Sequence, residues 1–587
     1  MKKSGIFIMA LVLVFLTSCN QGAGSSSRNS GDESLSSSLL ASSELDASGN
    51  ASVDSANTSS TKTQGNSAGV TPGNSFADNG VSSLSSAPAE SKVVVSRIVN
   101  KNGRYYPEYL GNPYLMYGVQ IRLDNIRADG VDDIDEWEKY WQMLKNLNMQ
   151  TIEIQVCWTA IEPIKDVYDF YDLELAIRWC EKYDLNMQII WFGSNVAGGP
   201  TDVPAYVKND RVTYPRNPKS PETHIKLDTP AFIDREKRAM QAMMDFIEQK
   251  DKNHRIMMVQ VEAEPDNVQG TAEINWQKPE SVAEWMWAGG QADASITLMD
   301  QLGRVVKNSN RPMITRAAFI DQSYINTILR GKEYLKKCFN TEGIDMVGID
   351  NYSAKLSAQN ELMDYLENLI PNNIAYQPET GAEQCNYISQ VLLAFSRANG
   401  HLVYELRTAD FMPSGLDTGF YRKSSRSWVE RDGTKTVDVY PNAGQGTMKE
   451  SNTSEIRSFN KTIYKASYHI ASLNKSNLTA FNLQEWNQAT APNRTSNQVC
   501  GKYKISCYSP QSKQGFSMCD TNGDVILLGF GALTQYTIEG KTLSGTASVG
   551  YFTKAGKWVE QSSVSLSGNT VTVYAEQCVR ISANDIK

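Results

Sequence analysis

The sequence predicts an α/β protein in which a (β/α)8 TIM barrel is followed by a C-terminal antiparallel β-sandwich domain. Between residues 115 and 480, short apolar runs alternate with segments of helical periodicity, which is typical of strand-helix units around a parallel sheet. After about residue 478 the pattern changes to period-two runs broken by turn residues, as in antiparallel hairpins. The chain has 587 residues, of which 41% are hydrophobic, and single cores stop growing at about 250–300 residues, so two folded units are expected.

Eight apolar runs are expected to form the parallel strands, and with the helices between them they close most simply into a barrel. In such a barrel the catalytic residues gather on the loops that follow the carboxyl ends of the strands. A doubly wound open sheet is the alternative, but it usually brings a glycine-rich nucleotide-binding turn that this sequence lacks. The eight runs are YGVQIRL (117–123), TIEIQVCW (151–158), MQIIWFG (187–193), IMMVQVE (256–262), PMITRAA (312–318), DMVGID (345–350), NIAYQPE (373–379) and HLVYEL (401–406).

Amphipathic segments lie between these runs. In residues 133–147, Trp137, Trp141, Leu144 and Leu147 recur at three- and four-residue steps and form one apolar stripe. Residues 169–185 repeat the pattern, and residues 454–473 are expected to form a last helix. The C-terminal strands are expected at 478–486, 502–509, 524–531, 548–558 and 569–577, with TNGD (521–524) as a turn.

The N-terminus has the pattern of an export signal. MKK is followed by the apolar run GIFIMALVLVF and by LTSC, which ends at Cys19, and the apolar run is too short for a stable membrane span. LTSC resembles a bacterial lipobox, which implies lipidation of Cys19 and a lipid-anchored location in the bacterial cell envelope, either periplasmic or surface-exposed. An ordinary signal peptide with a chance cysteine is the alternative. The membrane is expected as a partner only through this anchor.

The domain boundaries follow from composition. Residues 1–19 form the predicted lipoprotein signal peptide, and residues 20–92, dominated by Ser, Gly, Ala, Asn and Asp, carry too little apolar area to offset the entropy of ordering. They are expected to be a disordered tether. The barrel is assigned to residues 93–477 and the β-sandwich to residues 478–587.

Composition also excludes several functions. The 57 basic and 65 acidic residues leave a net charge of −8, which argues against a nucleic-acid partner. The four histidines are scattered, and no HExxH, paired CxxC, P-loop or dinucleotide fingerprint is present, so neither a metal nor a cofactor is expected. Cys157 and Cys180 lie in apolar runs and are expected in the core. Cys500, Cys507, Cys519 and Cys578 share the C-terminal region and are candidates for disulfides after export, although spacing does not give their pairing. No pattern in the sequence indicates the oligomeric state.

Two strand-end carboxylates are the candidate catalytic residues. Glu264 in VQVEAEPDN closes the fourth predicted strand, and Glu379 in YQPETGAE closes the seventh. Hydrolysis of a glycosidic bond needs one protonated carboxyl group and one ionised carboxylate, and a parallel barrel delivers strand-end side chains to one face. The alternatives are Glu262 or Asp266 as the acid, and Glu405 as the nucleophile if the strand count shifts by one.

The same stretches resemble a known group of enzymes. VQVEAEPDN resembles the VQxENE segment that ends strand four in family 35 β-galactosidases and related retaining (β/α)8 glycosidases, including family 42. CWTAIEPIKDVYDF (157–170) resembles their W-x-x-x-E-P-x-x-G-x-Y-D-F signature, apart from the glycine, and residues 191–210 and 214–216 resemble their loop after strand three. The resemblance covers roughly residues 110–410. It implies a β-galactosidase-like enzyme that releases terminal β-linked sugars from oligo- or polysaccharides, with Glu264 as acid/base and Glu379 as nucleophile.

One departure from that pattern leaves alternatives open. Most members of the group have asparagine before the acid/base, where it binds the sugar 2-hydroxyl, and this chain has Ala263. The substrate differs at its 2-position, another residue makes the contact, or the chain has lost turnover. The last case gives the alternative function, a catalytically inactive, lipid-anchored glycan-binding protein. A purely structural surface protein fits the tether but not the two strand-end glutamates.

Further residues near the predicted strand ends are candidates for binding carbohydrate. Sugars present apolar C–H faces and hydroxyl groups, so their clefts combine aromatic rings with amides and carboxylates. For the two tryptophans, ordinary core packing is the alternative, and the resemblance implies that Tyr352 contacts the nucleophile. The candidates are Trp158, Glu162, Trp191, Asn195, Glu262, Asn351 and Tyr352.

Overall fold

The computed structural model describes residues 92–101, 103–123, 134–194, 202–218, 224–265, 291–319, 332–351, 353, 355–380, 387–404, 420–422, 428–430, 452–485, 488 and 490–587. The chain divides into two units, Met1–Glu90 and Ser91–Lys587. The predicted signal peptide, Cys19 and the predicted tether up to residue 91 lie outside the described residues, and so do Asn195, Asp266, Tyr352 and Glu405.

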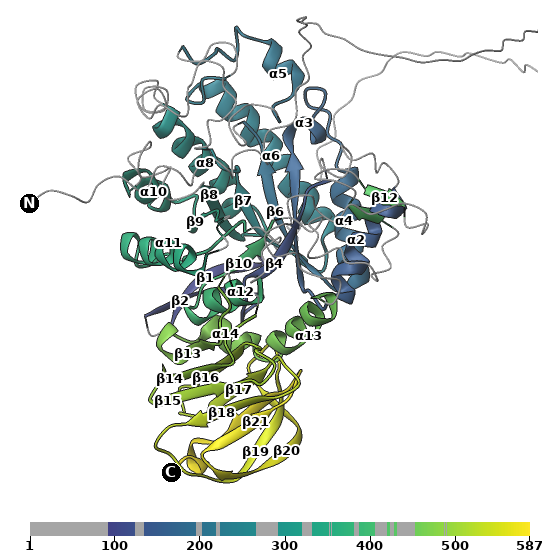
Figure 1. Ribbon diagram of the computed structural model, residues 1–587. Helices are drawn as coiled ribbons and strands as arrows, with labels where there is room; N and C mark the ends of the chain where they lie inside the picture. Colours follow the sequence, from purple (N-terminus) through teal and green to yellow (C-terminus); the bar gives the residue numbers. More distant parts are fainter. Residues whose placement is uncertain are drawn as a thin grey trace, which may run out of the picture. The chain divides into compact units, whose positions relative to one another are not determined.

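The second unit is mixed α/β and contains a curled parallel sheet of seven strands (Figure 1). The order is β10-β4-β5-β6-β7-β8-β9, so neighbours in the chain are neighbours in the sheet and the last strand pairs with the first. Seven of the eight predicted strands are present. They are β4 (Tyr117–Ile121), β5 (Thr151–Cys157), β6 (Asn186–Phe192), β7 (Ile256–Val261), β8 (Ile314–Phe319), β9 (Met346–Ile349) and β10 (His401–Val403).

The remaining prediction, a strand over residues 373–379, is only partly right. This segment makes isolated parallel bridges, from Tyr376 to Gly348 in β9 and from Gln377 to His401 in β10. The Asn373 side chain binds both the N–H (3.0 Å) and the C=O (2.9 Å) of Val347, taking the place of backbone partners. Pro378 has no N–H to donate to a ladder. The segment therefore lies between β9 and β10 without forming a regular strand.

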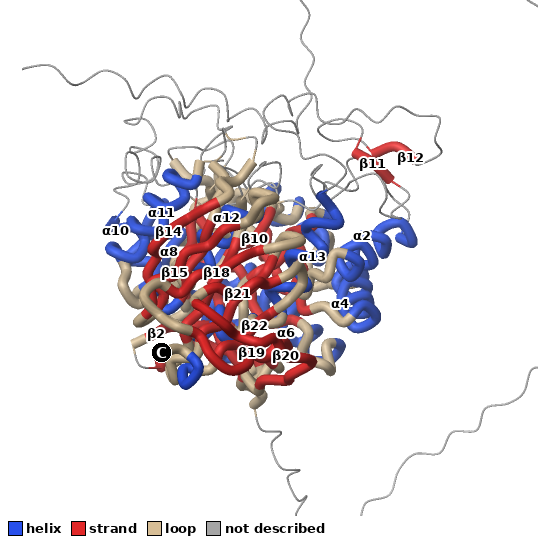
Figure 2. The backbone as a smooth tube through the Cα atoms, turned by 60° about the horizontal axis from the view of Figure 1, so that its bottom comes forward, coloured by secondary structure: helices blue, strands red, loops and turns tan. Residues whose placement is uncertain are grey.

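Helices surround this sheet, and α2 and α4 lie side by side in two views (Figures 1 and 2). The predicted helices over 133–147 and 169–185 are α2 and α4. No described helix is both long and apolar enough to span a bilayer. The helices are α2 (Ile134–Asn146), α3 (Trp158–Ile161), α4 (Tyr171–Tyr183), α5 (Ala205–Asn209), α6 (Pro230–Lys250), α8 (Gln291–Asn308), α10 (Lys332–Phe339), α11 (Leu356–Leu369), α12 (Tyr387–Ser396), α13 (Asn452–Tyr464) and α14 (Ser467–Ser472).

The predicted last helix, 454–473, is two helices, α13 and α14. The break falls at Lys465 and Ala466, because the Lys465 carbonyl accepts a hydrogen bond of 2.8 Å from the backbone N–H of Phe552 in the C-terminal sheet. A long-range contact thus takes an acceptor that a continuous helix would use.

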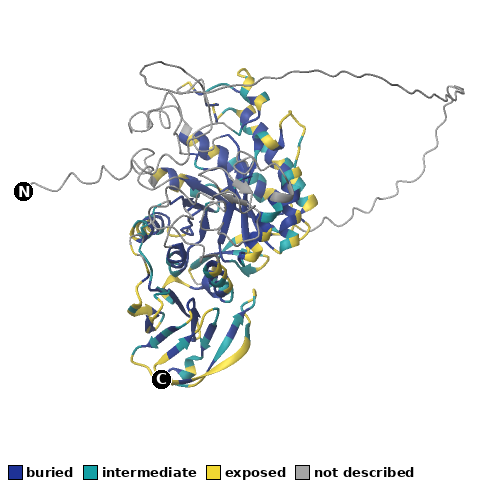
Figure 3. Ribbon diagram, turned by 45° about the vertical axis from the view of Figure 1, so that its right-hand side comes forward, coloured by how far each residue is buried: buried dark blue, intermediate teal, exposed yellow. Residues whose placement is uncertain are grey.

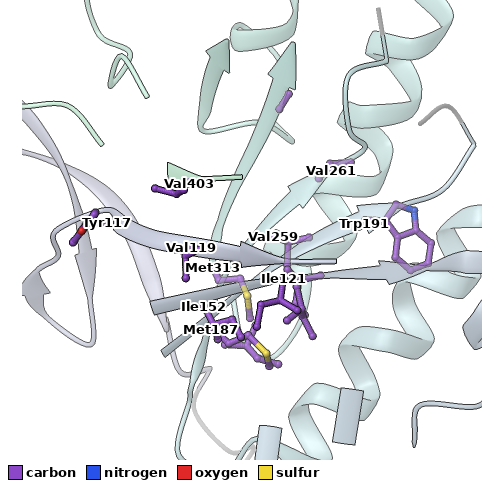
Figure 4. Close-up of a cluster of buried hydrophobic side chains, with 14 of the residues drawn as sticks. Tyr117, Val119, Ile121, Ile152, Met187, Trp191, Val259, Val261, Met313 and Val403 are labelled. Carbon is purple, nitrogen blue, oxygen red and sulfur yellow. The ribbon is translucent and has the colours of Figure 1, made fainter. Parts of the chain in front are cut away.

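Side chains on the two faces of the parallel sheet differ in character. The helix-facing side is apolar and includes Val119, Ile152 and Val259, part of the cluster in Figure 4. Figure 3 shows that buried residues concentrate in these strands. The inner side is polar at mid-height, where Gln120 and Glu153 are adjacent in register.

A small antiparallel sheet precedes the parallel one and packs at the amino ends of its strands. Ser96 Oγ accepts a hydrogen bond of 2.9 Å from the N–H of Ile314, and Tyr105 packs against a core that contains Met258. Its strands are β1 (Ser96–Lys101), β2 (Arg104–Tyr109) and β3 (Asn112–Pro113). A separate hairpin is formed by β11 (Phe420–Arg422) and β12 (Trp428–Glu430).

The C-terminal part consists of two antiparallel sheets that share a core. One sheet has the order β13-β16-β17-β22-β19-β20 and the other β14-β15-β18-β21. TNGD turns between β16 and β17, where the Gly523 N–H donates to Asp520 O at 3.0 Å. The strands are β13 (Leu478–Phe481), β14 (Arg494–Cys500), β15 (Tyr503–Tyr508), β16 (Gly515–Cys519), β17 (Val525–Gly529), β18 (Thr534–Ile538), β19 (Leu543–Phe552), β20 (Trp558–Gly568), β21 (Thr570–Val573) and β22 (Cys578–Ile581).

Two details bear on the predicted C-terminal domain. Phe516 and Leu528 belong to the same hydrophobic cluster as Phe459 of α13, so the sheets and the helices before them share a core across residue 478.

The four C-terminal cysteines are buried free thiols in this structure. Cys180 and Cys338 are also buried free thiols, and Cys157 is a partly exposed free thiol.

Candidate active site

Three carboxyl groups meet at the carboxyl ends of the parallel strands. Glu264, Asp350 and Glu379 each offer an oxygen, and these atoms all lie within 4.8 Å of one another. Glu264 follows β7, Asp350 follows β9, and Glu379 lies at the end of the segment between β9 and β10. Glu379 and Asp350 are buried, and Glu264 is partly exposed. The structure thus brings together the two carboxylates predicted from the sequence.

Asp350 is a member of this cluster that sequence reasoning missed. It ends the run DMVGID, so the criterion used for Glu264 and Glu379, a carboxylate at the end of an apolar strand, applies to it equally. Three carboxylates this close repel one another when all are ionised. They are also near enough to share one hard cation, because Ca²⁺ and Mg²⁺ prefer oxygen ligands.

Glu379 is held by contacts from two sides. Its carbonyl accepts a hydrogen bond of 2.8 Å from the N–H of Asn351, and its Oε1 accepts one of 3.0 Å from the Gln120 amide. The Nδ2 amide of Asn351 has no hydrogen-bond partner within the described part of the chain. Asn351, which was predicted to bind substrate, therefore lies beside the candidate nucleophile, and its side-chain amide is available to donate a hydrogen bond.

Gln120 connects Glu379 to a buried polar network. Its amide also donates to Glu153 at 3.2 Å, and Glu153 forms an ion pair with Arg316. Arg316 in turn donates to Gln260 at 2.8 Å and to Gln188 at 2.6 Å. Burial raises the pKa of Glu153, although the Arg316 guanidinium opposes the rise.

Glu264 is presented by a backbone turn with two left-handed residues. Glu262 has φ 64° and Glu264 has φ 48°, conformations that cost non-glycine residues on the order of 1–3 kcal/mol each. Such a turn persists only where surrounding contacts fix it. One anchor is the Glu262 carboxylate, which accepts hydrogen bonds from Ser194 N (3.2 Å) and Ser194 Oγ (3.3 Å).

Four of the predicted substrate-binding residues are buried and contact other side chains of the protein. Trp191 is fully buried and donates to Glu236 of α6 at 2.9 Å, and Glu262 lies beside the same group. Trp191 and Glu262 thus take part in the packing of β6 and β7 against α6, and their role in substrate binding stays a prediction.

Trp158 and Glu162 form a second structural group. Glu162 is fully buried, accepts from the Trp158 indole at 2.8 Å and from Asp166 N at 2.9 Å, and is ion-paired with Arg235. Trp158 is also fully buried and packs on Phe232 at 5.8 Å between ring centroids. The carboxylate of Glu162 and the ring of Trp158 thus make contacts within the protein, and their role as sugar contacts stays a prediction.

Ala263 lies in a small apolar cluster with Ile190 and Phe192, against which Cys157 packs. The guanidinium of Arg122 stands over the Phe192 ring at 4.4 Å. The position that carries a sugar-binding asparagine in the resembled enzymes is therefore apolar in its surroundings here.

Comparison with known proteins leaves the family open. Residues 295–489, about a third of the chain, match a family described as a domain of unknown function, DUF4978. No curated protein matches the sequence.

Three solved structures are similar to parts of the chain. A cold-adapted β-galactosidase from Rahnella sp. R3 has 11% identity and a TM-score of 0.40 over 61% of this chain and 57% of that one. A β-galactosidase from the psychrophilic Marinomonas ef1 has 10% identity and a TM-score of 0.41 over 62% of each chain. An exo-β-1,4-mannosidase from Opitutaceae bacterium strain TAV5 has 15% identity and a TM-score of 0.36 over 52% of this chain and 55% of that one. Likeness this low does not carry an activity over to this chain.

Proposed function

We propose that the chain is a retaining glycoside hydrolase that removes terminal β-linked sugars, with Glu264 as acid/base and Glu379 as nucleophile. The observation that supports this is the separation of their carboxylate oxygens, at most 4.8 Å. Retaining glycosidases hold the two carboxyl groups about 5–5.5 Å apart, whereas inverting enzymes need about 6.5–9.5 Å for an intervening water. The proposal places both residues on an eight-fold barrel in which the segment 373–380 takes the place of the seventh strand, between β9 and β10.

The proposed reaction has two steps. Glu379 attacks the anomeric carbon while protonated Glu264 donates its proton to the glycosidic oxygen, so the C–O bond breaks and a glycosyl ester forms on Glu379. Glu264, now a carboxylate, then takes a proton from water as the water oxygen attacks the anomeric carbon and releases Glu379. The Gln120 hydrogen bond orients one oxygen of the Glu379 carboxylate.

The substrate class rests on the sequence resemblance alone, which makes a β-galactoside the first candidate. Ala263 favours a second function, a glycan-binding protein without turnover, because the asparagine that strengthens transition-state binding is replaced within an apolar cluster. The two proposals differ in catalysis and not in ligand.

A screen of aryl glycosides with β-galactoside, β-glucoside, β-mannoside and β-glucuronide heads tests the proposal. We expect hydrolysis of one head group and, by NMR of the first product formed, a β-configured sugar. Glu379→Gln should lose activity by at least about 10³-fold, since removal of a covalent catalyst costs several kcal/mol. Glu361→Gln, an exposed carboxylate on α11, is the matched control. Binding of oligosaccharide without hydrolysis, unchanged in Glu379→Gln, supports the second function instead.

We also propose that the protein is a bacterial lipoprotein anchored at Cys19. The LTSC sequence after an apolar run supports this. Fractionation of cells that express the full chain tests it: the parent should sediment with membranes and incorporate labelled fatty acid, and Cys19→Ala should do neither.

A further inference from the structure

A second pair of acidic residues lies close to the turn that carries the candidate acid/base Glu264. Glu236 of α6 is fully buried and Glu262, after β7, is 1% exposed. Their Oε1 atoms lie 1.9 and 2.6 Å from the point where a Cβ on Gly193 would stand, so both occupy the space that this glycine leaves open. The Trp191 indole donates to Glu236 Oε1 at 2.9 Å, and Ser194 N donates to Glu262 Oε1 at 3.2 Å.

Two carboxylates cannot both be ionised at such a buried position, because desolvation and mutual repulsion disfavour the second charge. Burial, and then the charge of Glu262, raise the pKa of Glu236 well above its ordinary value. The other groups that face Glu236, Trp191 and Ser194, do not titrate in this range. Arg235, the preceding residue of α6, forms ion pairs with Glu162 and Asp166 instead.

The pair acts on the turn that carries Glu264. Glu262 and Glu264 have left-handed backbones, and only Ala263 separates them. Fixing the Glu262 side chain on the helix side of the sheet therefore fixes the direction in which Glu264 leaves the turn. A strained turn of this kind relaxes when its anchor is removed.

We propose that Glu236 and Glu262 are positioning residues, which share one proton and thereby hold the acid/base Glu264 in place. The inference rests on the proposed function of Glu264. It assigns to helix α6 a part in acid catalysis, although no residue of α6 belongs to the carboxylate cluster.

The test compares leaving groups, because acid catalysis matters most when the leaving oxygen is a poor one. Glu236→Gln keeps a donor for Glu262, and Glu236→Leu removes it. For Glu236→Leu we expect kcat on alkyl glycosides to fall at least about tenfold while kcat on dinitrophenyl glycosides falls less than about threefold. Glu236→Gln should stay within about threefold of the parent on both. An equal loss on both substrates, or no loss in Glu236→Leu, overturns the inference.

A second measurement does not depend on turnover or on the folding of Glu236→Leu. A carboxyl group whose pKa is raised in the folded state contributes stability below its ordinary pKa, and this stability is lost as pH rises toward the folded pKa. Glu236→Gln has no such proton, so its Tm minus that of the parent should grow between pH 5 and pH 9, by about 2 °C or more. A constant difference shows that no proton is shared. If the parent hydrolyses no glycoside at all, the proposed function fails, while this measurement still decides whether the proton is shared.

Discussion

Gln120 links the candidate nucleophile Glu379 to the polar side chains inside the parallel sheet. A single amide group donates to Glu379 and to Glu153, so the orientation of the nucleophile depends on the Glu153–Arg316 ion pair below it. Buried amides in such networks restrict side chains to one arrangement, and a lost partner leaves a buried acceptor unsatisfied.

Gln120→Met should therefore lower kcat/KM about 5–30-fold, equivalent to about 1–2 kcal/mol for a lost hydrogen bond to a charged group. Steady-state kinetics on the preferred aryl glycoside measure this. Gln241→Met, on an exposed position of α6, is the control. Activity equal to that of the parent would show that Glu379 is oriented without Gln120.

Ala263→Asn tests whether the surroundings of position 263, where the resembled enzymes have asparagine, are apolar. Ala263 is 5% exposed and packs with Ile190 and Phe192, so an amide placed there lacks water and should cost about 1–3 kcal/mol of unfolding free energy. Denaturant unfolding measures the change. Unchanged stability would mean that the amide reaches a polar partner at the carboxylate cluster, and the apolar interpretation of position 263 would be wrong.

The positions of the candidate site residues were predictable from the sequence only where the end of a strand fixes them. Glu264 and Glu379 were found because an apolar strand followed by a carboxylate is visible locally, and Asp350 was open to the same reasoning. The burial of Trp158 and Glu162 was not predictable, because it depends on Phe232 and Arg235 of α6, about 70 residues away. Glu236 has no local signal at all, since it lies inside a helix.

At the scale of elements, the junction of β6, β7 and α6 depends on close approach at Gly193. A Cβ there would stand 1.9 Å from Glu236 Oε1 and 2.5 Å from Trp191 Nε1, which no real contact allows. The sequence run WFGS shows a glycine after a strand, but not which helix requires it.

Gly193→Ala should force the carboxyl groups of Glu236 and Glu262 out of their site and lower both Tm and kcat. Overpacking of this kind costs about 1–3 kcal/mol. Gly540→Ala is the control, because no atom lies within 4 Å of its Cβ, so this variant carries only the backbone strain of φ 66°. Thermal unfolding and kinetics of the two variants should differ clearly, and equal values would place the Glu236 side chain elsewhere.

The helices and strands were predictable from hydrophobic periodicity, except where contacts with other parts of the chain interrupt them. Apolar runs predicted seven strands of the parallel sheet, because a strand buried on both faces needs them. The segment 373–379 departs from a regular strand where Asn373 and Pro378 replace backbone pairing, and 454–473 divides where Phe552 takes the carbonyl of Lys465. The first cause is visible in the sequence, and the second is not.

For the whole molecule, buried titratable groups limit stability from both sides of neutral pH. As pH rises, the Glu236–Glu262 pair loses its shared proton, and the free energy of unfolding falls. On the acid side, burial lowers the pKa of His401 to about 3 and that of His469 to about 4. His401 lies in β10 between Thr380 Oγ1 (3.0 Å) and Gln377 Oε1 (3.2 Å), so it joins the ends of the parallel sheet in its neutral form.

A histidine with a lowered folded pKa contributes stability above its ordinary pKa near 6.5, and this stability is lost as pH falls toward the folded value. Each such group gives a slope of about 1.4 kcal/mol per pH unit in that window. The free energy of unfolding of the parent should thus fall by about 2 kcal/mol between pH 6.5 and pH 5 through His401 alone. His401→Asn, which keeps a polar side chain at this position, should show a shallower decline. Denaturant unfolding of both proteins across this range measures the difference. Parallel curves would mean that His401 becomes protonated as readily in the folded chain as in the unfolded one, and the closure of the sheet at β10 would then not depend on a neutral imidazole.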